Sequence, residues 1–335
     1  MEVRADAVQA ENGGWRGRSG VHYTSRKLAV DGAEAFVPDH RIERIGLFTL
    51  QAVQLGGGLT VEAAGRYEHV RIKAEPPGFS RGFNLWSGAA GPAWQAAEGL
   101  TLGLNYIHGA RAPSPEELLS DGPHIATQAY EIGSPDFAIE KSEGFEAYAR
   151  YRSGSTELAL TAYRTSFDRF IGALPTDEEE DDLPVFRYVQ LPARYTGFEA
   201  SGRFEAVNWA TGALMLDASA DYTRARLKGV GPVPRIPPLR LLGGAELREG
   251  DLRLRGEVEW NHRQSRIAAF ENPVPAFTLV NFALDWHPLG ETGPLTVMLA
   301  ADNIFDVDAR RAASFTRDFV PLPGRDVRLT VLLGF

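Results

Sequence analysis

Apolar and polar residues alternate along many stretches of this chain. Between residues 251 and 261, Leu252, Leu254 and Val258 share one parity, and arginines and glutamates fill most of the positions between them. Successive side chains of a β-strand point to opposite faces of its sheet, so a period of two predicts strands with one apolar and one polar face. The same alternation recurs at 59–68, 145–151, 214–223 and 327–335. The pattern therefore predicts an all-β protein.

The alternating stretches and the turn residues between them predict about fourteen strands. Most of them are longer than the roughly 5–6 residues of an ordinary globular strand, and longer than the roughly 9–11 residues that a tilted strand needs to cross a bilayer. The extra length is expected to project beyond the membrane on the extracellular side. The predicted strands are 15–26, 41–55, 59–72, 80–95, 99–111, 140–152, 155–170, 184–206, 212–226, 235–248, 251–266, 275–287, 293–306 and 324–335.

The connections between these strands alternate between two kinds. The tight kind covers 56–58, 96–98, 153–154, 207–211, 249–250 and 288–292. The longer kind covers 27–40, 73–79, 112–139, 171–183, 227–234, 267–274 and 307–323. Membrane-spanning barrels have short periplasmic turns and longer extracellular loops, whereas a Greek-key sandwich has no reason for such regular alternation. We therefore predict a transmembrane antiparallel up-and-down β-barrel that forms one domain over residues 1–335.

Aromatic residues favour the same fold. Trp15, Trp94, Trp209 and Trp286 fall near the tight turns, where a periplasmic-side aromatic girdle would lie. The last predicted strand is amphipathic and stops on Phe335. A terminal strand of this kind resembles the last strand of bacterial outer-membrane barrels, which the assembly machinery reads as a signal.

Composition excludes several classes of function. The 335 residues carry a net charge of −9 and contain no cysteine. Disulfides and thiolate metal sites are therefore impossible, and the acidic balance argues against a nucleic-acid partner. The mean hydropathy of −0.22 is similar to that of a soluble protein, but alternating faces average to the same value. Met1 to Gly20 lacks the apolar core of a signal peptide, and no run approaches the roughly 18 apolar residues of a transmembrane helix.

Three segments resemble the C-terminal barrel region of TonB-dependent outer-membrane receptors. Within 104–142, an R-A-P element precedes a P-E-E-L-L stretch at 115–119, which the resemblance implies is a short helix. A G-S-P-D-F-A-I-E-K-S element at 133–142 is similar to the family's G-N-P-x-L-x-x-E-x-S, from which it departs at the second and fifth positions. Residues 301–306 are similar to its V-x-N-L-F-D strand end, and 323–335 to its P-G-R entry into the final strand. The resemblance covers essentially the whole chain.

The resemblance implies a location and a set of partners. Receptors of this kind are barrels of about 22 strands around a plug. No signal peptide, TonB-contacting box or plug is recognisable here, so the chain is expected to be the C-terminal part of such a barrel, in a truncated or split form. The implied location is the Gram-negative outer membrane with a periplasmic C-terminus. The implied partners are outer-membrane lipid and lipopolysaccharide, the barrel-assembly machinery, and the TonB system only if another segment supplies a plug.

The resemblance also implies a function, namely uptake of a scarce nutrient, either a ferric siderophore or a metal ion such as zinc. Two alternatives remain open. One is a passive porin-like channel, because barrels with even strand numbers from 8 upward exist. The other is a non-functional fragment, or a partner for a separately encoded N-terminal half. No catalytic motif or phosphate-binding glycine loop occurs, so we expect neither an enzyme nor a cofactor.

The candidate ligand residues lie in the long predicted loop 112–139. Asp121, His124 and Glu131 are the candidates, with Asp136 further along. Histidine is a common transition-metal ligand and carboxylates complete nitrogen–oxygen sites, so His124 and Asp121 are candidate metal ligands. The stretch from Asp121 to Thr127 also resembles a loop of zinc-uptake receptors in this family. The alternative is that these are solvated loop residues that bind nothing.

Charged residues outside this loop have ordinary interpretations. The six carboxylates of 177–182 lie in another predicted extracellular loop, and we expect a mobile solvated segment there rather than a cation site. On the polar faces of the strands, we expect arginines and glutamates to pair across neighbouring strands. These residues are Arg66, Arg150, Arg253, Arg255, Glu62, Glu146, Glu257 and Glu259.

Overall fold

The computed structural model describes residues 1–30, 32, 35–290 and 292–334 of the chain. Within these residues the strands form one 18-stranded sheet, and the predicted all-β, antiparallel up-and-down fold is confirmed. In chain order the elements are β1 (Glu2–Asn12), β2 (Trp15–Leu28), β3 (His40–Gly56), β4 (Leu59–Ala74), β5 (Phe79–Ala97), β6 (Leu100–Arg111), α1 (Pro115–Leu119), β7 (Asp121–His124), β8 (Ala129–Ile132), β9 (Glu140–Ser153), β10 (Thr156–Glu180), β11 (Leu183–Trp209), β12 (Gly212–Leu227), β13 (Gly231–Pro232), β14 (Arg240–Glu249), β15 (Leu252–Asn261), β16 (Phe277–Trp286), β17 (Leu295–Asp302) and β18 (Asp326–Leu333).

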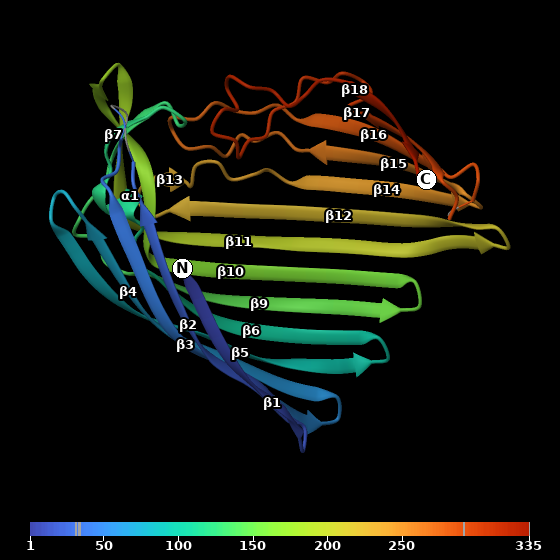
Figure 1. The fold of residues 1–335 in the computed structure, drawn as a ribbon, viewed down its shortest axis with the longest axis horizontal. Helices are drawn as coiled ribbons and strands as arrows, with labels where there is room; N and C mark the ends of the chain where they lie inside the picture. Colours follow the sequence, from blue (N-terminus) through green and yellow to red (C-terminus); the bar gives the residue numbers. More distant parts are fainter. Residues whose placement is uncertain (31, 33–34, 291, 335) are drawn as a thin grey trace.

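The long strands form a meander in which each pairs antiparallel with the next. β6 pairs with β9 and β12 with β14, because β7, β8 and β13 are short strands within long connections. The sheet is curved, with β1 and β18 as its two edge strands (Figure 1). Over the part of the chain described, no register joins β1 to β18. The same residues contain no helix that is long and apolar enough to cross a membrane.

The two ends of the strands differ as the sequence predicts. Tight turns at residues 13–14, 57–58, 98–99, 154–155, 210–211 and 250–251 gather at one end, with 287–290 and 292–294 beside them (Figure 1). We call this the turn end. The described residues of the connection after β2 (29–30, 32 and 35–39) and the connections 112–139, 228–239, 262–276 and 303–325 gather at the opposite end, which we call the loop end. Trp15, Trp94, Trp209 and Trp286 lie close to the turn end.

Sequence analysis misses the first strand of the sheet. The first predicted strand begins at residue 15, but β1 already pairs with β2 from Glu2 to Asn12. The alternation in β1 is weak, because Val3 and Val8 fall on opposite faces and most of its other apolar residues are alanines. Pairing with β2 therefore decides the conformation of this segment, which local hydrophobicity does not.

The prediction that residues 171–183 form a loop is also wrong. β10 continues to Glu180 and β11 begins at Leu183, so the acidic run forms the tip of a long hairpin whose turn is Asp181-Asp182. β8 pairs in parallel with β11 and buries Val185, which is 1% exposed. Pairing between β10 and β11, from Ile171↔Gln190 to Glu180↔Leu183, thus maintains the strand through residues that were predicted as a loop.

Strands in the C-terminal part are shorter at the loop end than predicted. The predicted strands 235–248 and 251–266 are observed at Arg240–Glu249 and Leu252–Asn261. The residues of the predicted strands that lie outside the observed ones belong to the connections 228–239 and 262–276, which fold over the end of the sheet. β18 ends at Leu333, and Phe335 lies outside the described residues.

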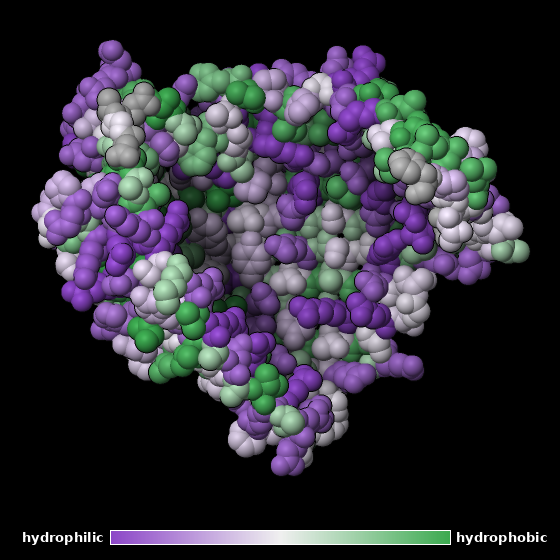
Figure 2. All heavy atoms as spheres, viewed as in Figure 1, coloured by the Kyte–Doolittle hydropathy of each residue, from purple (hydrophilic) through white to green (hydrophobic). Residues whose placement is uncertain are grey.

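The hollow of the sheet is polar. Figure 2 looks into this hollow, where hydrophilic side chains project from the strands. Arg255 on β15 donates to Asp217 on β12 at 2.7 Å and to Glu257 on its own strand at 3.1 Å. It reaches across β14 because Gly244 has no side chain, and a Cβ there would lie 2.6 Å from the guanidinium.

The prediction of pairing across neighbouring strands holds only in part. Arg253 lies 3.9 Å from Glu246 on the adjacent strand. Arg66 instead pairs with Glu68 two residues along its own strand, and Glu259 pairs with Arg311 from a connection. Long guanidinium side chains reach the best acceptor, which need not be the residue directly opposite.

Apolar side chains are buried mainly at the loop end. The largest cluster joins β4 and β5 to α1 and the extended part of β10. Its members are Val70, Ile72, Phe83, Leu85, Leu118, Phe137 and Ile171. Two smaller clusters form where the connections 228–239 and 303–325 pack on the strand ends. The loop end is therefore a packed cap on the sheet.

Candidate ligand-binding site at the loop end

The helix α1 begins the cap. Ser114 precedes Pro115, whose fixed φ suits the first helical position. The Ser114 hydroxyl accepts from the Glu117 backbone N–H at 3.3 Å, and the Glu117 carboxylate accepts from the Ser114 N–H at 2.8 Å. This reciprocal capping box satisfies two backbone donors that a helix start leaves open. The helix implied by the P-E-E-L-L resemblance is thus present at residues 115–119.

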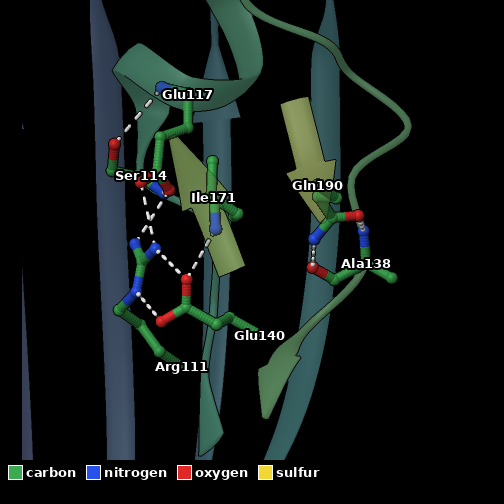
Figure 3. Close-up of polar contacts among 7 residues, drawn as sticks. All are labelled: Arg111, Ser114, Glu117, Ala138, Glu140, Ile171 and Gln190. Carbon is green, nitrogen blue, oxygen red and sulfur yellow. Dashed lines mark hydrogen bonds and ion pairs between the residues drawn. The ribbon is translucent and has the colours of Figure 1, made fainter. Parts of the chain in front are cut away.

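Arg111 ties the helix to the sheet (Figure 3). Its guanidinium donates to Glu117 on α1 at 2.8 and 3.0 Å, and to Glu140 at the start of β9 at 3.2 and 2.9 Å. Glu140 is 8% exposed and also accepts from the Ile171 backbone N–H at 2.8 Å. Charge-assisted pairs of this kind are the stronger hydrogen bonds of proteins. One arginine therefore joins β6, α1, β9 and, through Glu140, β10.

A second clasp holds the segment before β9. Gln190 on β11 accepts from the Ala138 N–H at 3.0 Å and donates to the Ala138 carbonyl at 2.7 Å (Figure 3). Between this clasp and α1, the β7–β8 hairpin lies against β11, where β8 pairs from Tyr130 to Ile132. The connection 112–139 is thus a folded unit, fixed at both ends.

Two of the predicted ligand residues meet on one face of this hairpin. The Nδ1 atom of His124 lies 2.9 Å from Glu131 Oε1. Glu131 also accepts from the hydroxyls of Thr127 and Tyr188, each at 2.9 Å. The ring of Phe36 stacks on His124 with centroids 4.2 Å apart. Glu131 is buried, with an exposure of 7%, and its carboxylate contacts all three of these polar side chains.

Asp121 does not join them. It lies on the other face of the β7–β8 hairpin, is exposed, and accepts from the Tyr130 hydroxyl at 3.2 Å. Asp136 is also exposed. Within the described ranges, no three His, Asp or Glu side chains are grouped closely enough to hold a metal ion. Any metal held at His124 would therefore need donors from the ligand itself.

A cavity of about 410 Å³ opens beside Glu131 and His124. Strands β10 and β11, the β7–β8 hairpin, α1 and three connections all contribute to its wall. Aromatic rings dominate this wall, and they are Phe36, Phe170, Phe186, Tyr188, Tyr195 and Phe315. Its charged residues are Arg235 and the carboxylates Glu116 and Glu131. Mostly apolar walls with a few convergent polar groups are typical of small-molecule sites.

Arg235 enters this wall from the connection 228–239. Its guanidinium carbon lies 3.9 Å from the centroid of the Phe315 ring. Burial lowers the pKa of Arg235, the neighbouring Arg317 acts in the same direction, and the Glu271 carboxylate opposes both. The residue stays charged, because arginine begins from a very high pKa. In the part of the chain described, no side-chain hydrogen bond or ion pair engages this guanidinium.

Arg235 is not among the ligand residues that the sequence predicts, because it lies at the start of the predicted strand 235–248. Nothing local marks this residue among the arginines of the chain. Its place depends on β14 beginning at Arg240 and on a third connection bringing Phe315 beside it. The P-V-P-R-I-P-P run at 232–238 indicates an irregular backbone, and it is the one local signal at this position.

The family model for TonB-dependent receptor-like β-barrels matches residues 4–304. The chain belongs to this family. Its members are outer-membrane proteins, and the matched family and similar structures are receptors and transporters. The matched range contains every residue named above as lining the cavity except Phe315.

Solved structures of such barrels are similar in fold. The copper transporter OprC is 18% identical with a TM-score of 0.83, over 99% of this chain and 56% of that one. The FrpB iron transporter from Neisseria meningitidis is 14% identical with a TM-score of 0.74, over 98% and 53%. The ferric enterobactin receptor PfeA from Pseudomonas aeruginosa is 16% identical with a TM-score of 0.71, over 100% and 54%. This TonB-dependent receptor-like barrel therefore spans little more than half the length of each.

Proposed function

We propose that the chain is the barrel part of an outer-membrane receptor that takes up a scarce nutrient, either a ferric siderophore or a metal ion. The observation that carries this proposal is the cavity at the loop end of a barrel from this family. Three similar structures are named as transporters of copper or iron or as a receptor for ferric enterobactin, which supports the ligand class.

In this proposal the whole of 1–335 is one barrel domain of such a receptor. The loop end faces the exterior and the C-terminus lies on the periplasmic side. Ligand capture involves His124 and Glu131 at the cavity and Asp121 on the outer face of the hairpin. Phe335 serves as the signal for the assembly machinery. The TonB system acts on this barrel only through a plug that another segment supplies.

A passive channel is less well supported. A pore needs a closed ring of strands, and the described part of the chain shows no pairing between β1 and β18. Edge strands with unpaired backbone groups are not tolerated against lipid. Strands from another segment, placed between β1 and β18, would satisfy both edges.

The test is ligand binding by the purified chain in detergent. Zn²⁺, Cu²⁺ and ferric enterobactin serve as probes, each titrated against the wild type, His124→Ala and Glu131→Gln. His287→Ala is the matched control, because His287 lies at the turn end. We expect at least one probe to bind saturably and the loop-end variants to weaken it, with the control unchanged. Identical binding by all four proteins would refute the assigned residues, and no binding of any probe would refute the proposed ligand classes.

A further inference from the structure

The cavity at the loop end has Glu131 on one side and Arg235 on another, and these two charged residues differ in their hydrogen bonding. On the side of the β7–β8 hairpin, Glu131 is engaged by His124, Thr127 and Tyr188. On the side of the connection 228–239, the Arg235 guanidinium has no partner for its donors among the described residues, although it lies against the Phe315 ring. A half-buried cation with open donors favours an acceptor that arrives with the ligand.

The backbone that presents Arg235 is fixed. Arg235 has a left-handed φ of +59°, which a residue with a Cβ seldom adopts unless its surroundings impose it. Its N–H donates to Glu271 Oε1 at 2.8 Å, and the other oxygen of Glu271 accepts from the Ala268 N–H at 2.9 Å. Arg317 lies 3.1 Å from Glu271, and both side chains are 5% exposed. A buried ion pair thus joins three connections and sets the turn that carries Arg235.

The rest of the wall is suited to a flat apolar body. Tyr195 and Phe170 have ring centroids 5.7 Å apart, and Phe186 and Tyr188 lie close by on β11. A volume of about 410 Å³ is within the range of small-molecule sites. Rings stack on rings with offset or edge-on geometry, so aromatic ligands gain most from such walls.

We propose that this cavity binds a planar aromatic acid, with Arg235 as the residue that holds its anionic group. The inference rests on the proposed uptake function and decides between its two ligand classes. The site takes an organic anion, free or as the arm of a metal complex, and a bare metal ion is not its ligand. Arg235 holds the acid group through charge-assisted hydrogen bonds, and the aromatic walls hold the ring.

Replacement of Glu116 is expected to have the opposite effect on ligand binding. It lines the same cavity from α1, and its side chain has no hydrogen-bond partner in the described ranges. A carboxylate near a bound anion opposes binding, because like charges repel in a poorly solvated site. Replacing Glu116 by glutamine should therefore strengthen the binding that replacing Arg235 weakens.

The test uses 4-fluorobenzoate as the probe and follows its ¹⁹F resonance with the purified full chain in detergent. 4-Fluorobenzamide has the ring without the charge, and cyclohexanecarboxylate, added as a competitor, has the charge without the ring. The variants are Arg235→Gln, Arg235→Lys and Glu116→Gln. The matched control is Arg266→Gln, because Arg266 also lies over a ring, that of Tyr222 at 5.1 Å, but outside this cavity.

We expect fluorobenzoate to bind and the amide to bind more weakly, with cyclohexanecarboxylate a poor competitor. Arg235→Gln should weaken binding by roughly tenfold or more, the size of a lost charged hydrogen bond. Arg235→Lys should retain part of the affinity, Glu116→Gln should raise it, and Arg266→Gln should leave it unchanged. Arg235→Lys also keeps the test valid if Arg235→Gln fails to fold, which the mobility of the unheated protein in gels will show.

Two results overturn the inference. One is that fluorobenzoate does not bind, and the other is that it binds equally to Arg235→Gln and to the wild type. If Zn²⁺ or Cu²⁺ nonetheless binds with dependence on His124, the uptake proposal stands and only the ligand class is wrong. If none of the probes binds, both proposals fail.

Discussion

The turn end and the loop end use the same strands in different ways. Toward the turn end the strands point apolar side chains outward, and many are exposed, such as Leu158 at 48% and Leu160 at 50%. At the loop end the apolar side chains of β4, β5 and β10 are covered by α1 and the connections, and Ile72 and Leu118 are 1% exposed. In lipid an outward leucine needs no protein cover, whereas beyond the membrane it does. Among the described residues, the packed apolar clusters therefore lie at the loop end, where the strands extend beyond the bilayer.

The largest effect should separate the two ends directly. Leu118→Ala empties a site in the loop-end core and should cost about 2–5 kcal/mol of unfolding free energy. Leu329→Ala, on an outward position that is 68% exposed, should cost less than about 1 kcal/mol. Denaturant unfolding of both variants in the same detergent measures the difference. Equal costs would mean that the cap is not a packed core.

Loss of the arginine that anchors α1 should have the next largest effect on stability. Arg111→Met leaves Glu117 and the buried Glu140 without their shared cation and should destabilise the cap by about 2–3 kcal/mol. Limited proteolysis should then cut within 112–139 while the strands stay intact. Arg152→Met, a change at a 77% exposed turn-end arginine, serves as the control and should not alter the cleavage pattern.

A pair of adjacent glycines tests the polar hollow against the outer face. Gly244→Ala places a Cβ 2.6 Å from the Arg255 guanidinium and should cost about 1–3 kcal/mol through displacement of the bridge to Asp217. Gly243→Ala meets no atom within 4 Å and should be nearly neutral. Unfolding free energies of the two variants give the comparison. If Gly243→Ala is the more damaging, the assignment of faces in β14 is wrong.

The smallest effect belongs to the tip of the long hairpin. Glu178 and Arg187 pair at 2.7 Å, but their side chains are 62% and 47% exposed. Glu178→Gln should therefore change stability by at most about 1 kcal/mol, and by less in high salt. Thermal unfolding at two salt concentrations measures this change. A larger loss would show that the acidic tip supports the cap.

Sequence alone predicts the sheet far better than the cap. The alternation around Leu252 or Leu254 is a local signal, because one face meets lipid and the other the polar hollow. β1 lacks that signal, and so does the extension of β10 from Ile171 to Glu180, which pairs with β11. Both were missed because pairing with a neighbouring strand, and not local periodicity, determines them.

In the candidate site, too, some residues can be predicted from the local sequence and others come together only in the fold. His124 and Glu131 lie in one short hairpin, so a search along the chain finds both. Arg235 meets them only through the fold, since three separate connections bring it, Glu271 and Phe315 together. Proximity in sequence predicts that Asp121 joins His124, but the alternation of β7 places it on the other face.

The most direct test of the account asks which end of the sheet faces the exterior. The chain has no cysteine, so single-cysteine variants can be labelled without background. Glu179→Cys places a thiol at the tip of the β10–β11 hairpin, and Ser155→Cys places one in a tight turn at the opposite end. A membrane-impermeant maleimide added to intact cells should label Glu179→Cys alone, and should label both variants once the outer membrane is permeabilised. Labelling of Ser155→Cys but not Glu179→Cys in intact cells would contradict a ligand-capturing loop end.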